Sequence, residues 1–319
     1  MFVSLRRFGV LTVTALTLLA TSAFALDTVK FMVPGPSGGG YDQTARLLGK
    51  ALLEAGAAKA VTFENKGGAG GTLGLAQFAN STKGNPDALL IVGAVMVGAL
   101  VQNKPPITLE EVTPIARLFS EYNVIAVRNA SPHKTLDDLL AEFEANPSNV
   151  KWAGGSKGSV DHIGIAELAG KLNIPIDKVN YIAFGGGGEA VAAALGGHVT
   201  AITGGYAELS KYIGSGQFRV LAVGSPSRMA GVDAPTLKER GLDMTIGNWR
   251  GVYGAANLTP AQRQEVTEAV LAATGTKVWK ESLQANAWLP SFISGDDFAE
   301  FVEDEHSRLR DMLSEVGLL

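Results

Sequence analysis

Two stretches share one layout: VKFMVPGPSGGGYDQTARLLGKAL at 29–52 and VKWAGGSKGSVDHIGIAELAGKL at 150–172. Each begins with a Val-Lys-aromatic strand, passes through a glycine-rich turn and an acid, and continues into a helix that contains Gly-Lys. A second pair of glycine-rich turns, GGAGG at 67–71 and GGGG at 185–188, follows in the same relative places. This weak internal repeat predicts two similar lobes, each with two glycine-rich turns at the carboxyl ends of its strands.

The rest of the chain alternates between short apolar runs and segments with helical spacing of apolar residues. We expect strands at 28–33, 60–64, 88–92, 124–127, 150–153, 179–183, 199–203 and 220–223. We expect helices at 42–54, 72–79, 135–144, 160–172, 189–195, 207–214 and 294–315, with a further helix starting at 259–262. Strands that alternate with helices predict an α/β fold with mostly parallel sheets.

Composition excludes several classes of function. The chain has 319 residues, a formal net charge of −4 and no cysteine. An acidic chain without a basic run is a poor partner for nucleic acid. The absence of cysteine excludes disulfide scaffolds, cysteine-ligated metals and thiol catalysis, and the four histidines show no metal-binding spacing. We therefore expect no metal, no cofactor and no nucleic acid.

The N-terminus has the pattern of a cleavable signal peptide. Arg6 and Arg7 precede an apolar stretch at 8–20, and Ala23 and Ala25 form the small-x-small pattern of a cleavage site. The alternative is a membrane anchor, but this stretch is short for a hydrocarbon layer of ~30 Å. We predict a signal peptide at 1–25, a mature chain that begins at Leu26, and export to the periplasm.

The glycine-rich turns have the chemistry of anion sites. A helix N-terminus presents unpaired backbone N–H groups and the positive end of the helix dipole. Glycine before it lets a ligand approach closely, so an anion can be held without Lys or Arg. Such turns can also be no more than tight connections, but four of them in matched pairs favour a ligand with two or more carboxylates.

One segment suggests an enzyme instead. The turn Gly154-Gly155-Ser156-Lys157-Gly158 matches the G-x-S-x-G pattern of a serine hydrolase, which would also need His198 or His306 and an acid. No HGGG-type oxyanion segment accompanies it, so an exported serine hydrolase remains the alternative function. Arg250, in GNWRGVYG, is a candidate either for a carboxylate contact or for a structural ion pair.

Several motifs together resemble one family. These are VPGPSGGGYDQTARLL at 33–48, ENKGGAGGTLGLAQF at 64–78, KWAGGSKGSVDHI at 151–163, NYIAFGGGGEAVAAALGGHV at 180–199 and NWRGVYG at 248–254. The sequence resembles the substrate-binding receptors of tripartite tricarboxylate transporters, the Bug family, and within it the tricarboxylate-binding branch. The resemblance implies a two-lobed periplasmic-binding-protein fold, type II-like, with a ligand cleft between the lobes. It implies a receptor that delivers an organic acid to a membrane permease of two unlike subunits.

The resemblance and the glycine turns together imply boundaries and site residues. Lobe 1 is expected at 26–126 plus 248–319 and lobe 2 at 127–247, with hinge segments near 124–130 and 244–252. The expected ligand is a di- or tricarboxylate such as citrate, held partly through water by a monomeric receptor. The expected binding residues are Pro36, Ser37, Gly39, Gly40, Asp42, Gly70, Gly71, Ser156, Asp161, His162, Gly186, Gly187 and Tyr206.

Overall fold

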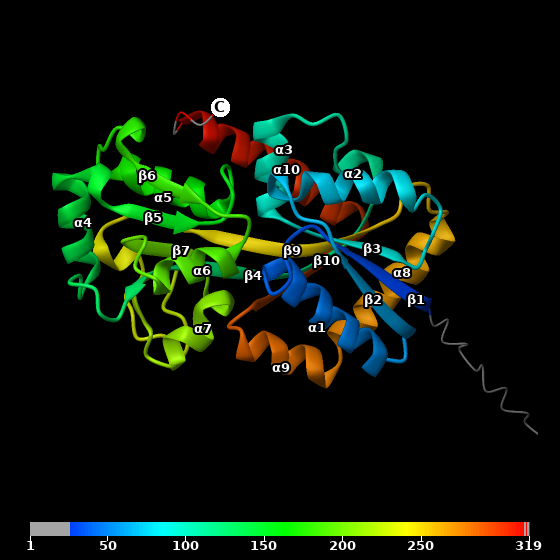
Figure 1. The fold of residues 1–319 in the computed structure, drawn as a ribbon. Helices are drawn as coiled ribbons and strands as arrows, with labels where there is room; N and C mark the ends of the chain where they lie inside the picture. Colours follow the sequence, from blue (N-terminus) through cyan, green and yellow to red (C-terminus); the bar gives the residue numbers. More distant parts are fainter. Residues whose placement is uncertain (1–25, 316, 318) are drawn as a thin grey trace, which may run out of the picture.

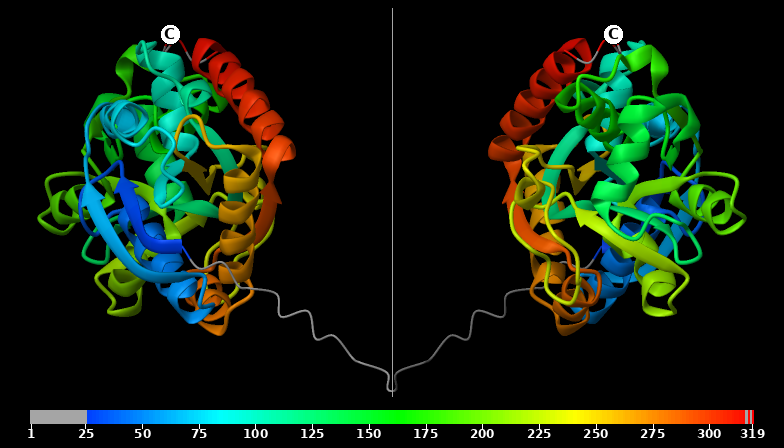
Figure 2. Two further views of the ribbon diagram at one scale, coloured as in Figure 1. Left: turned by 90° about the vertical axis from the view of Figure 1, so that its right-hand side faces the viewer. Right: turned by 90° about the vertical axis from the view of Figure 1, so that its left-hand side faces the viewer.

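The computed structural model describes residues 26–315, 317 and 319, and it has the predicted α/β architecture in two lobes (Figure 1). The predicted signal peptide at 1–25 lies outside the described residues. The described strands form one hydrogen-bonded path in the order β2-β1-β3-β9-β4-β7-β5-β6, with β8 and β10 also paired to β4. Figure 2 looks along the long axis from both ends and shows helices on both sides of the strands.

The first lobe contains the N-terminal and C-terminal parts of the described chain. Its strands are β1 (Leu26–Val33), β2 (Ala58–Asn65), β3 (Ala88–Gly93), β9 (Gly247–Gly254) and β10 (Leu289–Ser294). Its helices are α1 (Gly40–Glu54), α2 (Thr72–Ser81), α3 (Ala94–Asn103), α8 (Pro260–Thr274), α9 (Lys277–Ala285) and α10 (Gly295–Glu315). Alternate residues of β3 enter two different apolar clusters, so this strand is buried on both faces.

The second lobe contains the middle of the chain. Its strands are β5 (Lys151–Gly154), β6 (Asn180–Ala183), β7 (Ala201–Gly205) and β8 (Phe218–Val223). Its helices are α4 (Leu136–Ala145), α5 (Val160–Lys171), α6 (Gly187–Leu195) and α7 (Tyr206–Gly214). The strands that lead into the glycine-rich turns are parallel in both lobes: β1 pairs with β2 and β3, and β5 pairs with β6 and β7.

One long strand connects the lobes. β4 (Thr113–Arg128) pairs antiparallel with β9 as far as Tyr122, and from Asn123 onward it pairs with β7. The Asn123 N–H donates to the carbonyl of Ile246 at 2.9 Å, so a second crossing segment lies beside it. Both crossings fall at or beside the predicted hinge segments, while the exact lobe boundaries stay a prediction.

The sequence predicted the βα units but not all of the first lobe. The capping-box starts of α4 at Thr135 and of α8 at Thr259 are confirmed. The prediction gave β4 only four residues, whereas the strand has 16 residues. It also had no helices at α3 and α9. The α10 helix packs on α3 and β4 of its own lobe and also contacts α5 of the second lobe.

Candidate functional site

A cavity of about 170 Å³ lies between the lobes, where the glycine-rich turns meet. The first lobe contributes residues 34–36, 39–41 and 68–71 to its wall, and the second lobe contributes residues 155–156, 185–187 and 205. These segments lie at or just after the carboxyl ends of β1, β2, β5, β6 and β7, which is where ligand sites lie in open α/β sheets.

The helices that begin at this cavity share an unusual start. The N-cap residues of α1, α2, α3, α6 and α7 are all glycines, and within the described chain none of these helices has a side-chain cap. Their first residues or N-caps line the cavity in four cases, and α3 contributes Val95. The N–H groups of these first turns, with the positive ends of the helix dipoles, therefore surround one small space.

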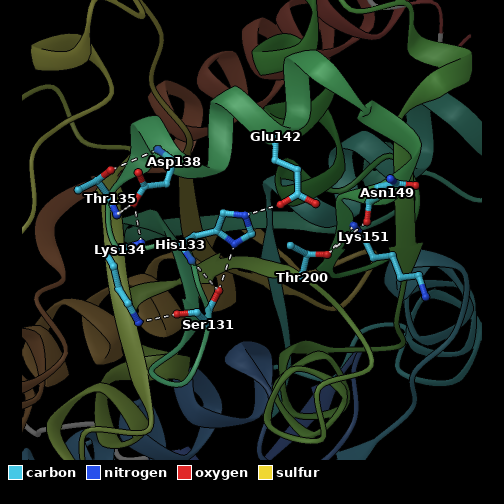
Figure 3. Close-up of polar contacts among 9 residues, drawn as sticks. All are labelled: Ser131, His133, Lys134, Thr135, Asp138, Glu142, Asn149, Lys151 and Thr200. Atoms are coloured by element: carbon cyan, nitrogen blue, oxygen red, sulfur yellow. Dashed lines mark hydrogen bonds and ion pairs between the residues drawn. The ribbon is translucent and has the colours of Figure 1, made fainter.

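Helix starts elsewhere are closed by side chains. Thr135, Thr259 and Thr276 each accept a hydrogen bond from a backbone N–H in the first turn of α4, α8 and α9. Figure 3 shows the α4 start, where Thr135 and Asp138 form a reciprocal capping box. The start of α5 is an intermediate case, since its preceding loop lines the cavity but Ser159 caps it.

A buried arginine stands at one wall of the cavity. Arg250 on β9 is 5 % exposed, and its Nη2 pairs with Glu121 Oε1 at 2.8 Å. Asn248 Nδ2 also donates to Glu121 Oε1, at 3.1 Å. Burial acts to lower the pKa of Arg250, but the nearby carboxylates outweigh burial and raise it, so the guanidinium stays charged. Among the described atoms, its Nε and Nη1 have no hydrogen-bond partner.

Two further acids face the same space. Asp161 on α5 accepts from the Gly155 N–H at 2.7 Å and from Asn123 Nδ2. Glu208 on α7 accepts from the Gly40 N–H, which belongs to the other lobe. Burial raises the pKa of both carboxyls, and with added repulsion from Glu121 the pKa of Glu208 reaches about 7.

Nine of the thirteen predicted binding residues line the cavity. They are Pro36, Gly39, Gly40, Gly70, Gly71, Ser156, Asp161, Gly186 and Gly187. They come from both lobes and from all four glycine-rich turns, so the structure brings together the segments that the repeat singled out. Whether each of them touches a ligand stays a prediction.

The other four predicted residues lie outside the cavity wall. Asp42 accepts from the Gly38 N–H at 2.9 Å, from Arg46 Nε at 2.8 Å and from Asn65 at 3.1 Å. Burial acts to raise its pKa, but these donors lower it. The carboxylate of Asp42 thus holds the first glycine turn, and its contact with a ligand stays a prediction.

His162 has a similar local role in the second lobe. Its Nδ1 accepts from the Gly158 N–H at 3.0 Å, and its ring lies 4.4 Å from the ring of Tyr181. Burial, with a smaller effect of Lys157, lowers the pKa of His162 to about 4, so the ring is neutral and able to accept. Ser37 is exposed at the tip of its loop, and Tyr206 packs with the apolar cluster of the second lobe.

The cavity lacks the parts of a hydrolase. Ser156 lines the wall, but no histidine is among the residues that line it.

The described residues also hold no group of three or more His, Cys, Asp or Glu side chains that could bind a metal ion. In the part of the chain that the structure describes, no helix has the length and apolar character needed to cross a membrane.

Comparison with known families identifies the class of protein. The family described as "Tripartite tricarboxylate transporter family receptor" (TctC) matches residues 45–318. The chain belongs to this family. Its function is therefore that of a solute-binding receptor rather than an enzyme, and the hydrolase alternative is wrong. Receptors of this family are periplasmic, in agreement with the predicted compartment.

Relatives cover nearly the whole receptor. The BugT protein of Bordetella pertussis is 28 % identical over 304 residues, which are 94 % of this chain and 92 % of BugT. MatC from Rhodopseudomonas palustris with bound malate superposes with a TM-score of 0.81 at 23 % identity, over 91 % of this chain and 100 % of MatC. An R. palustris protein with adipate gives a TM-score of 0.82 at 19 % identity, over 91 % and 97 % of the two chains. At these identities the two structures confirm the two-lobed fold.

Proposed function

We propose that this receptor binds a small di- or tricarboxylate in the cavity and delivers it to the permease of a tripartite tricarboxylate transporter. The observation that carries the proposal is the convergence of five glycine-started, uncapped helices on one space. Unpaired N–H groups and helix dipoles favour negative charge at several separate points, so a ligand with two or more carboxylates satisfies them best.

Arg250 supplements the backbone groups. A guanidinium on a rigid strand presents several donors in a fixed plane, and one of its nitrogens is already held by Glu121. A charged group that is buried, immobile and next to the cavity adds attraction that salt screens poorly. The sequence left Arg250 open between a carboxylate contact and a structural ion pair. The ion pair with Glu121 is present, and we propose that the charge of Arg250 also attracts the ligand.

The size of the cavity favours the shorter acids. At about 170 Å³ it is close to the ~150 Å³ of an engineered cavity that binds benzene. Dicarboxylates of four to six carbons suit such a space, and the two structural relatives hold malate and adipate. Assignment to the tricarboxylate branch stays a prediction.

The two lobes, 26–126 plus 248–319 and 127–247, are proposed to close on the ligand about the β4 crossing. In the described structure, glycine-rich segments of the two lobes lie close together. A Cβ on Gly186 would lie 2.7 Å from Cγ of Pro36 in the other lobe, and one on Gly98 would overlap the carbonyl of Gly158. We propose that the lobes separate further when a ligand enters. We further propose that the mature receptor starts at Leu26 in the periplasm and acts as a monomer.

Calorimetry and thermal unfolding of the mature protein with malate, adipate and citrate test the proposal. A ligand at 100 times its dissociation constant adds about 2.7 kcal/mol of stability and raises the melting temperature. The dimethyl esters are the control, because they keep the carbon chain and lose the charges. Binding of the diacids alone supports the proposal. Binding of the esters, or of no carboxylate at all, contradicts it.

A further inference from the structure

The side chain of Glu208 crosses the cleft. It is carried by α7 of the second lobe, yet its carboxylate accepts from the Gly40 N–H at the start of α1 in the first lobe. A Cβ on Gly40 would lie 2.6 Å from Glu208 Oε1, and a Cβ on Gly187 would overlap Glu208 Oε2. Glycine at these two helix starts therefore makes room for a carboxylate that the protein itself supplies.

The charges around Glu208 are unbalanced. Among the described residues, the charges that act on it are those of Glu121 from β4, Asp161 from α5 and one cation, Arg250 from β9. Glu121 already has Arg250 and Asn248 as donors, and Asp161 has Asn123 and the Gly155 N–H. Glu208 is half-buried and lies between two acids that share one cation, so a negative charge on its carboxyl is unfavourable.

A ligand carboxylate brings one more negative charge into this cluster. Two carboxylates in contact cannot both stay ionised at low cost, whereas a carboxyl that keeps its proton donates a hydrogen bond to the other. We infer that Glu208 is the specificity-determining residue of the cavity, and that it binds the ligand as a protonated carboxyl donating to one ligand carboxylate. The inference rests on the proposed function. The proton comes from solvent on binding and returns to it on release.

The pKa of Glu208 in the empty site, about 7, sets the direction of the pH dependence. Below pH 7 the carboxyl already carries its proton, so affinity for the dianion changes little with pH. Above pH 7 each binding event must take up a proton, so the dissociation constant rises by up to roughly tenfold per pH unit. A ligand that placed an ammonium group against Glu208 would show the opposite trend.

Titration calorimetry with malate at pH 6, 7, 8 and 9 tests this, run in two buffers of different ionisation enthalpy. We expect uptake of about one proton per malate at pH 8 and affinity that falls above pH 7. Glu208→Gln presents an amide donor at every pH, so it should bind malate without proton uptake and at pH 9 more tightly than the wild type. Glu144→Gln is the control, because Glu144 is an exposed acid on α4 that does not line the cavity.

Three results would overturn the inference. Malate affinity that is constant from pH 6 to 9 in the wild type, without proton uptake, would do so even if Glu208→Gln failed to fold. Loss of malate binding in a folded Glu208→Gln protein would also overturn it. Tighter binding of an amino-dicarboxylate as the pH rises would make Glu208 an ammonium partner instead. Failure of the wild type to bind any carboxylate at any pH would refute the proposed function itself.

Discussion

The N-termini of α4 and α1 differ in how their first backbone N–H groups find hydrogen-bond acceptors. At α4, Thr135 and Asp138 satisfy each other's backbone N–H groups, and His133 Nε2 lies 2.6 Å from Glu142 (Figure 3). At α1, Gly39 has no side chain to offer, and the turn faces the cavity. The starts of α4, α8 and α9 are closed by a side chain of the same turn, whereas the start of α1 has no such cap and its Gly40 N–H donates to Glu208 of the other lobe.

This contrast has an energetic side. A glycine N-cap is typically less stabilising than a Ser, Thr, Asp or Asn cap by only a few tenths of a kcal/mol, so each of these starts gives up a small amount of stability that the α4, α8 and α9 starts keep. The loss is concentrated around one cavity, where a bound anion can supply the missing acceptors. Functional sites commonly sacrifice stability in this way. The variants described next change one side of the contrast at a time.

The largest effect is expected from Arg250→Met. Removal of the guanidinium leaves the buried carboxylate of Glu121 without its ion-pair partner, which typically costs about 3–5 kcal/mol. Urea unfolding should show that loss, and calorimetry should show no malate binding. The double variant Arg250→Met with Glu121→Gln should regain much of the stability without regaining binding. Unchanged malate affinity in Arg250→Met would show that Arg250 does not contribute to ligand binding.

A strong effect on binding is expected from Gly40→Val. The added side chain would overlap the guanidinium of Arg250 and approach Glu208, and overpacking of this kind typically costs about 1–3 kcal/mol. We expect the dissociation constant for malate to rise at least roughly hundredfold, which corresponds to a loss of about 2.7 kcal/mol of binding free energy.

Gly188→Val is the matched control for this glycine, because a Cβ at Gly188 would have no atom within 4 Å. It lies in the same kind of helix start but outside the cavity wall. Equal losses of affinity in both variants, measured by calorimetry, would mean that the glycines matter for folding and not for ligand approach.

A moderate effect, on stability alone, is expected from Thr135→Ala and Thr259→Ala. Each removes a side-chain cap from a helix remote from the cavity, so the free energy of unfolding should fall by about 1 kcal/mol. Malate affinity should stay at the wild-type value, because no ligand group replaces these caps. A loss of malate affinity in either variant would contradict the claim that helix starts capped by a side chain take no part in ligand binding.

The smallest effects are expected from Lys66→Ala and Lys157→Ala. Both lysines are exposed and neither lines the cavity, so salt screens whatever attraction they exert on an anion. Titrations at low and at physiological salt should differ from the wild type by less than about 1 kcal/mol. Large losses of malate affinity in the lysine variants, together with normal binding by Gly40→Val, would mean that surface charge rather than the backbone binds the ligand.

Local patterns made much of the fold predictable from the sequence. The glycine turns, the Thr135 and Thr259 caps and the alternation of strands with helices each depend on a few adjacent residues. The α3 helix was missed because its apolar residues continue directly from those of β3, so 88–101 shows no polar face to mark a helix. The length of β4 was missed because its partner strand changes from β9 to β7 partway along it, and no local sequence pattern marks that change.

The candidate site was predicted mainly at and beside the glycine-rich turns. Glycine-rich turns are visible as a local sequence pattern, and nine of the residues chosen in or beside these turns line the cavity. The side chains that set its charge come from distant positions: Glu121 pairs with Arg250 across 129 residues, and Glu208 sits in an ordinary amphipathic helix. Asp42 and His162 were chosen for their place beside the turns, and the structure uses both to hold those turns.

The most direct test of the central claim is a crystal structure of the mature protein with bound malate. The account predicts both carboxylates in the cavity, with oxygen atoms that accept, directly or through one water, from N–H groups at the starts of α1, α2 or α6. It also predicts no anion at the starts of α4, α8 and α9, where threonine side chains are already in place. Malate held only by side chains, or bound outside the cavity between the lobes, would contradict the account.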